Sequence, residues 1–138
     1  MGVPSVNCPR PAHQVASKRR KLLRKHILLV DDQRPVRDAI NLLLGLDEHI
    51  VVEATNGAQA LASFKPNHFD LVITDLEMPQ MKGDELAKRI KQISPSQPIL
   101  MITAYTERLG DADNPVDAVL NKPFQLEDFR RTMAELLA

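Results

Sequence analysis

The stretch Asp70-Leu71-Val72-Ile73-Thr74-Asp75 decides the fold that we expect for this chain. Its apolar residues follow one another without polar alternation, and an acid bounds the run on each side. A short continuous apolar run is typical of a strand that is covered on both faces, as in parallel sheets. Ligands of open parallel sheets bind outside the carboxyl ends of the strands. The stretch therefore predicts a buried parallel strand that ends in a candidate functional carboxylate, Asp75.

Similar apolar runs alternate with amphipathic stretches along the rest of the chain. We predict further strands at 27–30, 50–52, 99–102 and 118–120. The intervening apolar residues have helical spacing: Val36, Ala39, Ile40, Leu43 and Leu44; Ala60, Leu61 and Phe64; Leu86, Ile90 and Ile93; and Leu126, Phe129, Met133, Leu136 and Leu137. This alternation predicts an α/β fold, a three-layer α/β/α doubly wound sandwich around a five-stranded parallel sheet.

The charge of the chain is unevenly distributed. Residues 1–25 hold seven of the 18 basic residues and no acid, so the rest of the chain is acidic although the net charge is zero. Three prolines and little apolar periodicity predict that this basic N-terminal arm is largely disordered and that the domain comprises residues 26–138. Because no aromatic residue or recognition helix accompanies the basic cluster, we do not expect the arm to bind nucleic acid.

Location can also be inferred from the sequence. A single cysteine, Cys8, cannot form an intramolecular disulfide, which suits a reducing compartment. No apolar run approaches the roughly 20 residues that a membrane-spanning helix needs, and the N-terminus lacks the apolar core of a signal peptide. We therefore expect a cytoplasmic protein that does not contact a membrane.

Polar residues stand at the ends of the predicted strands and carry the functional interpretation. Asp31 and Asp32 follow the first strand, Asp75 the third, Thr103 the fourth and Lys122 the fifth. Singly, an acid at a strand end is usually a helix cap, and a lysine there is usually solvated. All five share one rim of a parallel sheet, so together they favour a binding or catalytic site.

These residues resemble the motif set of bacterial response-regulator receiver domains. The resemblance rests on Asp31-Asp32, on Asp75-Leu76-Glu77-Met78-Pro79, and on Gly83, Thr103-Ala104 and Lys122-Pro123-Phe124. It covers residues 26–138 and implies a flavodoxin-like strand order of 2-1-3-4-5. In that order the first and third strands are neighbours, so the three aspartates form one cluster.

Such a cluster needs a cation, because like charges about 4 Å apart near a protein surface repel by roughly 4 kcal/mol. Oxygen ligands without His or Cys favour a hard ion such as Mg²⁺, or Mn²⁺. The resemblance implies that Asp32 and Asp75 bind the ion directly and that Asp31 acts largely through water. It also implies that the backbone carbonyl of Glu77 completes the protein ligands.

The resemblance further implies a phosphorelay signalling switch and not a turnover enzyme. Asp75 would accept a phosphoryl group from a histidine kinase or a histidine phosphotransfer protein, while Lys122 and Thr103 contact phosphoryl oxygens. The domain would then change conformation and regulate a downstream protein partner. Lys122-Pro123 is expected to be a cis peptide.

Three features depart from the family pattern. Val119 stands where receivers usually have an aromatic residue that moves on activation. The segment between Thr103 and Lys122 is short, and 110–115 is a poor helix sequence, so we predict a fourth helix reduced to about one turn near 106–109. Dimerisation through that face becomes doubtful, and we expect a monomer or weak dimer. Glu77 stands where the family tunes water access to the acceptor.

The same residues bear on three alternative functions. An aspartyl phosphatase of the haloacid-dehalogenase type needs a second Asp two residues after the nucleophile, where this chain has Glu77. A flavodoxin-like carrier needs a phosphate loop after the first strand, where the acidic pair would repel a phosphate. A receiver-like interaction module that is never phosphorylated is the remaining alternative.

Overall fold

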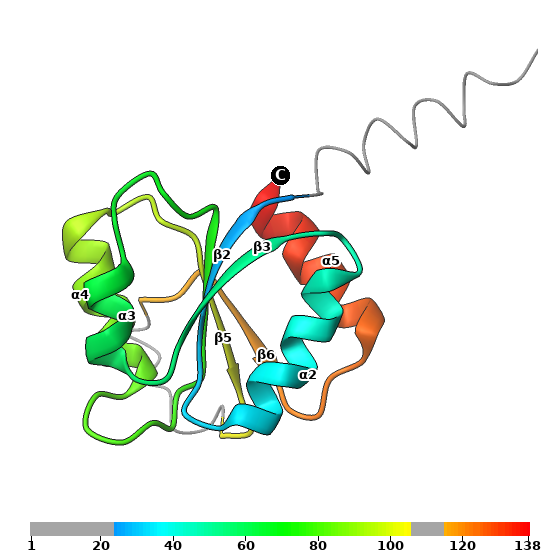
Figure 1. Ribbon diagram of the computed structural model, residues 1–138, viewed down its shortest axis with the longest axis horizontal. Helices are drawn as coiled ribbons and strands as arrows, with labels where there is room; N and C mark the ends of the chain where they lie inside the picture. The colour runs from blue at the N-terminus through cyan, green and yellow to red at the C-terminus, as the bar shows by residue number, and fades with distance from the viewer. Residues whose placement is uncertain (1–23, 106–114) are drawn as a thin grey trace, which may run out of the picture.

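The computed structural model describes residues 24–105 and 115–138, and Figure 1 shows how its helices and strands are arranged. In chain order the elements are β2 (His26–Val30), α2 (Arg34–Gly45), β3 (Ile50–Ala54), α3 (Gly57–Ser63), β4 (Leu71–Thr74), α4 (Gly83–Ile93), β5 (Ile99–Thr103), β6 (Ala118–Asn121) and α5 (Leu126–Leu137).

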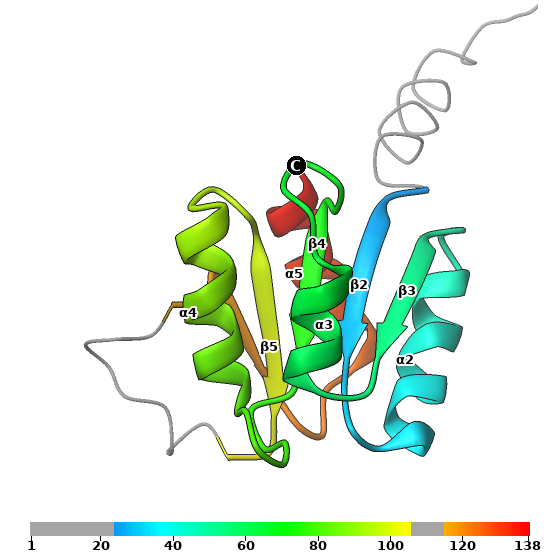
Figure 2. The same ribbon diagram turned by 60° about the vertical axis from the view of Figure 1, so that its left-hand side comes forward.

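The five strands form one parallel sheet in the order β3-β2-β4-β5-β6. Numbered along the chain, this is the expected order 2-1-3-4-5, which confirms the fold class. Figure 2 shows β5, β4, β2 and β3 side by side in that order. The two central strands are in register through Leu28 and Val72, and Val72 in turn pairs with Ile99 of β5. As a result, strands from distant parts of the sequence end at one rim.

Helices cover both faces of the sheet, and the sheet separates two apolar cores (Figure 1). On one face, Leu28 and Val72 pack with Leu86 and Ile90 of α4 and with Ala60 of α3. On the other face, the alternate strand residues Ile27, Leu29, Leu71 and Ile73 pack against the helices. The helix residues in this core are Ile40 and Leu44 of α2 and Phe129 and Met133 of α5. Because strand side chains alternate between faces, a strand with an unbroken apolar run contributes to both cores.

Local sequence signals explain where the helices begin. Pro35 lies in the first turn of α2, where a missing backbone N–H removes no helical hydrogen bond. Asn56 caps α3, because its side-chain oxygen accepts a hydrogen bond of 2.7 Å from the Gln59 N–H. Asp84 and Glu85 lie in the first turn of α4, where negative charge interacts favourably with the helix dipole. These signals hold the helices in place over the sheet.

A bridge between distant segments joins the end of α4 to the start of β6. Lys91 Nζ donates to the Gln97 carbonyl at 2.6 Å and to Asp117 Oδ2 at 2.8 Å. The same Asp117 oxygen accepts the Ile99 N–H at 2.8 Å. The Lys91 side chain is 22% exposed, so this ion pair is partly shielded from solvent. The bridge fixes the entry of β6 against β5.

Several predicted inward positions are wrong. Strand β3 lies at the sheet edge, as the order 2-1-3-4-5 implies, and Ile50 is 50% exposed on it. Ile93 is the last residue of α4 and Leu126 the first residue of α5, and both are exposed because they extend beyond the sheet that their helices cover. Ala39 also faces solvent on α2. The segment 106–109 and the arm up to residue 23 lie outside the described residues.

The described part of the chain contains no helix with the length and apolar character that crossing a membrane requires.

The two isoleucines of α4 provide a matched test of the core. Ile90 is fully buried and Ile93 is 51% exposed on the same helix. We expect Ile90→Ala to lower the free energy of unfolding by about 2–4 kcal/mol, because the substitution removes apolar contacts and leaves a cavity. Ile93→Ala should change it by less than about 0.5 kcal/mol. Urea unfolding followed by circular dichroism measures both, and equal losses would contradict the described packing of α4.

Candidate functional site

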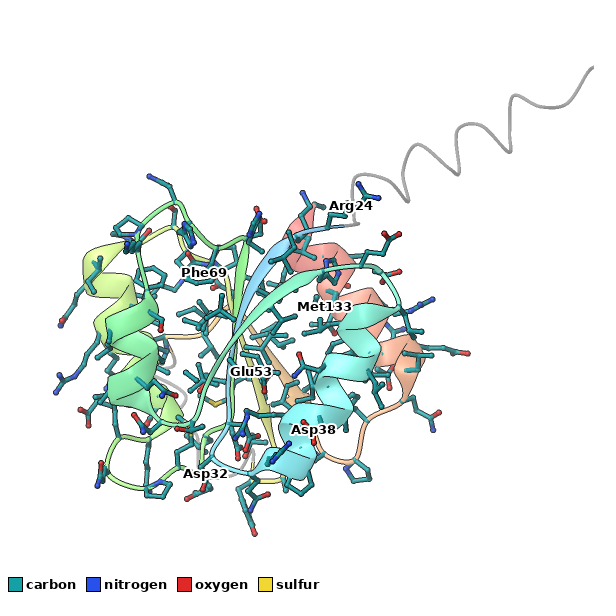
Figure 3. All side chains as sticks on the ribbon, in the orientation of Figure 1. Arg24, Asp32, Asp38, Glu53, Phe69 and Met133 are labelled. Atoms are coloured by element: carbon teal, nitrogen blue, oxygen red, sulfur yellow. The ribbon has the colours of Figure 1, made fainter. Side chains whose placement is uncertain are left out.

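The polar strand ends meet at the carboxyl rim of the sheet, as the sequence predicts. Asp31 directly follows β2, Asp75 follows β4, Thr103 ends β5 and Lys122 follows β6. Figure 3 shows Asp32 at this rim, beside the start of α2, whereas Arg24 and Phe69 lie at the opposite rim. The fold therefore collects the candidate residues on one side of the molecule.

Three of these residues form an acidic cluster, which we define as Asp31, Asp32 and Asp75. One carboxylate oxygen from each lies within 4.8 Å of the others. The Asp31 and Asp75 side chains are only 3% and 11% exposed, while Asp32 faces solvent. Two buried acids and one exposed acid thus open onto a shared point that water or an ion can reach.

Lys122 is the nearest cation among the described residues of this rim. Its Nζ lies 3.9 Å from Asp31 Oδ2 and 3.9 Å from Asp75 Oδ2, so one ammonium group stands between two carboxylates. Both distances exceed a hydrogen bond, and the lysine offsets part of the negative charge without binding either acid tightly. Its long flexible stem leaves it able to turn toward a third anion.

Burial changes the protonation equilibria of Asp31 and Asp75. Burial raises the pKa of Asp75, against the opposing effects of Lys122 and of the backbone N–H groups of Leu76 and Glu77. Burial likewise raises the pKa of Asp31, and the charges of Asp75 and Asp32 add to that rise. Desolvation disfavours the charged form of a carboxylate, and a bound cation would favour it.

Backbone groups fix both buried aspartates. The Asp75 N–H donates to the Val30 carbonyl at 3.2 Å, and the Leu76 N–H donates to Asp75 Oδ1 at 2.8 Å. The Asp31 N–H donates to the Ala54 carbonyl at 3.1 Å, and its Oδ1 accepts the Gln33 N–H at 2.9 Å. In each case the second oxygen, Oδ2, is the one that faces Lys122.

The loop after Asp75 packs closely against it. A Cβ added to Gly83 would lie 2.0 Å from the Asp75 carbonyl oxygen, closer than any side chain can approach. The Gly83 N–H donates to the Leu76 carbonyl at 2.9 Å, so the first residue of α4 contacts the backbone that follows Asp75. Between them, Met81 N–H donates to the Pro79 carbonyl at 2.8 Å around Gln80, whose φ is 71°. This tight γ-turn was not foreseen from the sequence.

The remaining candidate residues lie on the two strands beside the cluster. Thr103 is fully buried, and its Oγ1 accepts the Tyr105 N–H at 3.0 Å, while its carbonyl accepts the Lys122 N–H at 2.9 Å. Val119 is half-buried on β6 and pairs with Met101 of β5. The Lys122-Pro123 peptide is cis, as expected from the resemblance.

Comparison with known proteins decides the family. Residues 27–134 match the response regulator receiver domain family. The chain belongs to that family. Receiver domains are signalling domains of two-component phosphorelay systems, in which they interact with histidine kinases and downstream effectors, and they are not classical enzymes.

Relatives and solved structures agree with this assignment. The response regulator receiver protein CpdR of Brucella abortus is 36% identical over 116 residues, covering 82% of this chain and 97% of that protein. The response regulator MprA of a Mycobacterium species is 35% identical over 114 residues, covering 80% of this chain and 50% of MprA, so the chain spans about half the length of that relative. Response regulator TrrA of Thermotoga maritima, solved in complex with Mg²⁺-BeF, has a TM-score of 0.74 and 30% identity, covering 81% of this chain and 98% of TrrA.

The donor set of this receiver domain fits a divalent metal ion. Three carboxylates converge within 4.8 Å, the described ligand atoms of the cluster are all oxygens, and burial makes two of the acids costly to ionise without a counter-charge. Lys122 supplies one positive charge against three aspartates. The acidic cluster therefore supports divalent metal binding.

Substitution of Gly83 tests its packing against the Asp75 backbone. We expect Gly83→Ala to destabilise the receiver domain by about 1–3 kcal/mol, because the new methyl group must displace the Asp75 backbone. Gly45→Ala is the matched control, since nothing lies within 4 Å of a Cβ added there, and it should be neutral or stabilising by up to about 1 kcal/mol. Chemical denaturation measures both variants. A Gly83→Ala variant as stable as the wild type would contradict the described contact.

The raised pKa of Asp75 predicts a pH-dependent stability. The pKa of Asp75 in the folded protein lies above the unfolded value of about 3.9. Its contribution to the free energy of unfolding is therefore fully present at low pH, where Asp75 is protonated, and is lost as the pH rises through the folded-state pKa. Without divalent ions, Asp75→Asn should therefore gain stability relative to the wild type as the pH rises from about 4 to 7.

Magnesium should reverse that difference at pH 7. At ten times its Kd, Mg²⁺ should stabilise the wild type by about 1.4 kcal/mol and the Asp75→Asn variant by much less. Thermal unfolding in EDTA and in Mg²⁺ across this pH range measures both effects. A stability difference that is the same at every pH and in both solutions would contradict the electrostatic origin of the shift.

Proposed function

We propose that Asp75 is the phosphoryl acceptor of this receiver domain and that Asp31, Asp32, Asp75 and the Glu77 backbone carbonyl bind Mg²⁺, or Mn²⁺, beside it. The observation that carries the proposal is the position of Asp75, which belongs to the acidic cluster and also lies 3.9 Å from Lys122 Nζ. An anion acceptor needs both a cation site and a mobile positive side chain, and Asp75 is adjacent to each. The complex of TrrA with Mg²⁺-BeF supports the choice of ion.

In the proposed reaction, an oxygen of the Asp75 carboxylate attacks the phosphorus of a phosphohistidine. An O–P bond forms as the N–P bond of the donor breaks, and the electron pair of that bond stays on the imidazole nitrogen, which takes up a proton. Such a transfer depends mainly on alignment and on neutralising the phosphoryl oxygens. The Leu76 N–H, which holds Asp75 Oδ1, orients the carboxylate so that Oδ2 is the oxygen directed toward Lys122.

Lys122 and Thr103 complete the contacts to the phosphoryl group. Bound Mg²⁺ supplies positive charge at one phosphoryl oxygen. The Lys122 ammonium, with a stem that is not locked by a tight ion pair, turns from the carboxylates to a second oxygen. The Thr103 hydroxyl oxygen already accepts one hydrogen bond, and its proton is directed to a third oxygen. Attack of water on the acyl phosphate later returns Asp75 to a carboxylate, so the domain catalyses its own transfer and dephosphorylation.

The signalling consequence begins at Thr103. Movement of its hydroxyl toward the phosphoryl group displaces the Tyr105 N–H that it holds at 3.0 Å, and so moves the segment that follows β5. Val119 lies on β6 beside β5, and Pro123 follows Lys122 in the cis peptide. Val119 in place of an aromatic residue alters how the movement reaches the surface.

The proposed partners are a histidine kinase or histidine phosphotransfer protein in the cytoplasm and one downstream protein. The domain comprises residues 26–138, preceded by the basic arm at 1–25. A phosphorylation-inert interaction module is not favoured, because every residue that the transfer needs lies on one rim of the sheet.

Phosphorylation by a small donor tests the proposal. After incubation with acetyl phosphate and Mg²⁺, intact mass spectrometry should show one phosphoryl group on the wild type. The adduct should be absent with EDTA and absent in Asp75→Asn. Asp38→Asn is the matched control, because Asp38 is an exposed acid on α2 whose side chain lies 3.8 Å from Arg34, and it should be phosphorylated like the wild type. A wild type that acquires no magnesium-dependent adduct would refute the function.

A further inference from the structure

We propose that Arg37 is a positioning residue that fixes the peptide between Asp31 and Asp32, and so holds the acidic cluster in the geometry that binds a divalent ion. The inference rests on the proposed metal site and concerns how this chain builds it. Arg37 lies in the first turn of α2 and does not belong to the cluster itself. Its side chain is only 12% exposed, which is unusual for an arginine at the start of a surface helix.

The Arg37 guanidinium joins two elements. Nη1 donates to the Asp31 carbonyl oxygen at 2.8 Å, and Nε donates to Glu53 Oε1 at 3.1 Å. Glu53 belongs to β3, one residue before Ala54, whose carbonyl accepts the Asp31 N–H. The planar guanidinium presents its donors in a fixed fork, so contacts to two anchored acceptors determine its position. Figure 3 shows Glu53 on β3 and Asp32 at the rim near the start of α2.

Within the cluster, Arg37 contacts the backbone carbonyl of Asp31 and not a carboxylate, so we assign it a positioning role and not a charge-pairing role. The Asp31 carbonyl belongs to the planar peptide that connects Asp31 to Asp32. A change in ψ of Asp31 would rotate that plane about the Cα–C bond of Asp31. It would move the Cα of Asp32 and with it the direction of the Asp32 side chain. The Asp31 N–H and Oδ1 are held by Ala54 and Gln33, and Oδ2 lies 3.9 Å from Lys122 Nζ. Among these contacts, the Arg37 hydrogen bond is the one to the peptide that links Asp31 to Asp32. Asp32 itself is exposed, and packing does not hold its side chain.

Charge alone does not explain the arrangement. Glu53 Oε1 lies 3.1 Å from Arg37 Nε and offsets part of the Arg37 charge, so the pair adds less positive potential at the cluster than an unpaired arginine would. Arg34, in the same turn of α2, provides the comparison. Its side chain is 82% exposed and reaches only Asp38, at 3.8 Å. Two arginines of one helical turn thus have different surroundings, and only Arg37 contacts the acidic segment through a hydrogen bond.

Binding of Mn²⁺ alone tests the inference without phosphorylation. Free Mn²⁺ has a strong electron paramagnetic resonance signal that decreases on binding, so a titration gives the Kd directly. We expect Arg37→Met to weaken Mn²⁺ binding about tenfold, the size of loss seen when a group that orients metal ligands is removed. Arg34→Met should bind Mn²⁺ within about threefold of the wild type, because the contact of Arg34 is an exposed ion pair with Asp38 and not a hydrogen bond to Asp31.

Lys91→Met controls for loss of stability. Lys91 bridges a carbonyl and a carboxylate just as Arg37 does, but it does so between α4 and the start of β6. Arg37→Met and Lys91→Met should both lower the urea midpoint, and only Arg37→Met should lose Mn²⁺ affinity. This separation distinguishes a positioning residue from one that merely stabilises the fold.

Each outcome decides the inference. Binding by Arg37→Met that is at least threefold weaker than binding by Lys91→Met supports it, and binding within threefold of Lys91→Met overturns it. If circular dichroism shows that Arg37→Met is unfolded, Arg37→Lys replaces it under the same criterion, because lysine keeps the charge but lacks the fork. A wild type that binds no Mn²⁺ overturns the inference together with the proposed metal site, whereas a failure confined to the Arg37 variants leaves that site intact.

Discussion

The repulsion among three carboxylates at one rim is the constraint on which the rest of this site depends. The fold imposes it, because β2 and β4 are neighbouring parallel strands and an aspartate directly follows each of them. Burial adds to the cost, since it raises the pKa of both Asp31 and Asp75. A sheet rim with this charge is unstable by itself and gains stability from any cation that enters it. The same charge that costs stability favours a cation at the rim.

The protein meets this repulsion with two kinds of contact. Backbone N–H groups hold one oxygen of Asp31 and one of Asp75, which fixes the acids without consuming the oxygens that face the site. Lys122 stands 3.9 Å from the other oxygens, close enough to offset charge and loose enough to move. Fixed acids and a loosely held lysine are consistent with the proposed roles, in which the acids bind a metal ion and the lysine contacts a phosphoryl group after transfer. The Thr103–Tyr105 hydrogen bond connects this site to the segment after β5. Under the proposed function, a conformational change at the rim would pass to that segment.

The sequence predicted the parts of this structure that depend on local pattern. Continuous apolar runs identified the central strands, and the polar residues after them identified the rim, while the strand order came from family resemblance. Contacts between distant residues were not predictable, because the pairing of Arg37 with Glu53 and of Lys91 with Asp117 depends on the sheet register. Helical spacing also failed at helix ends: Ile93 and Leu126 have the right period but lie beyond the covered surface. Gly83 was recognised by motif, whereas the reason for it, an approach to the Asp75 carbonyl, appears only in three dimensions.

Chemical trapping of the phosphorylated residue tests the central claim most directly. Borohydride reduces an aspartyl phosphate to homoserine, which tandem mass spectrometry locates in the sequence. After transfer from a phosphohistidine donor in Mg²⁺, we predict homoserine at position 75, with Asp31 and Asp32 unchanged. Homoserine at position 31 or 32, or a phosphorylated protein that yields none at position 75, would contradict the assignment of Asp75 as the acceptor.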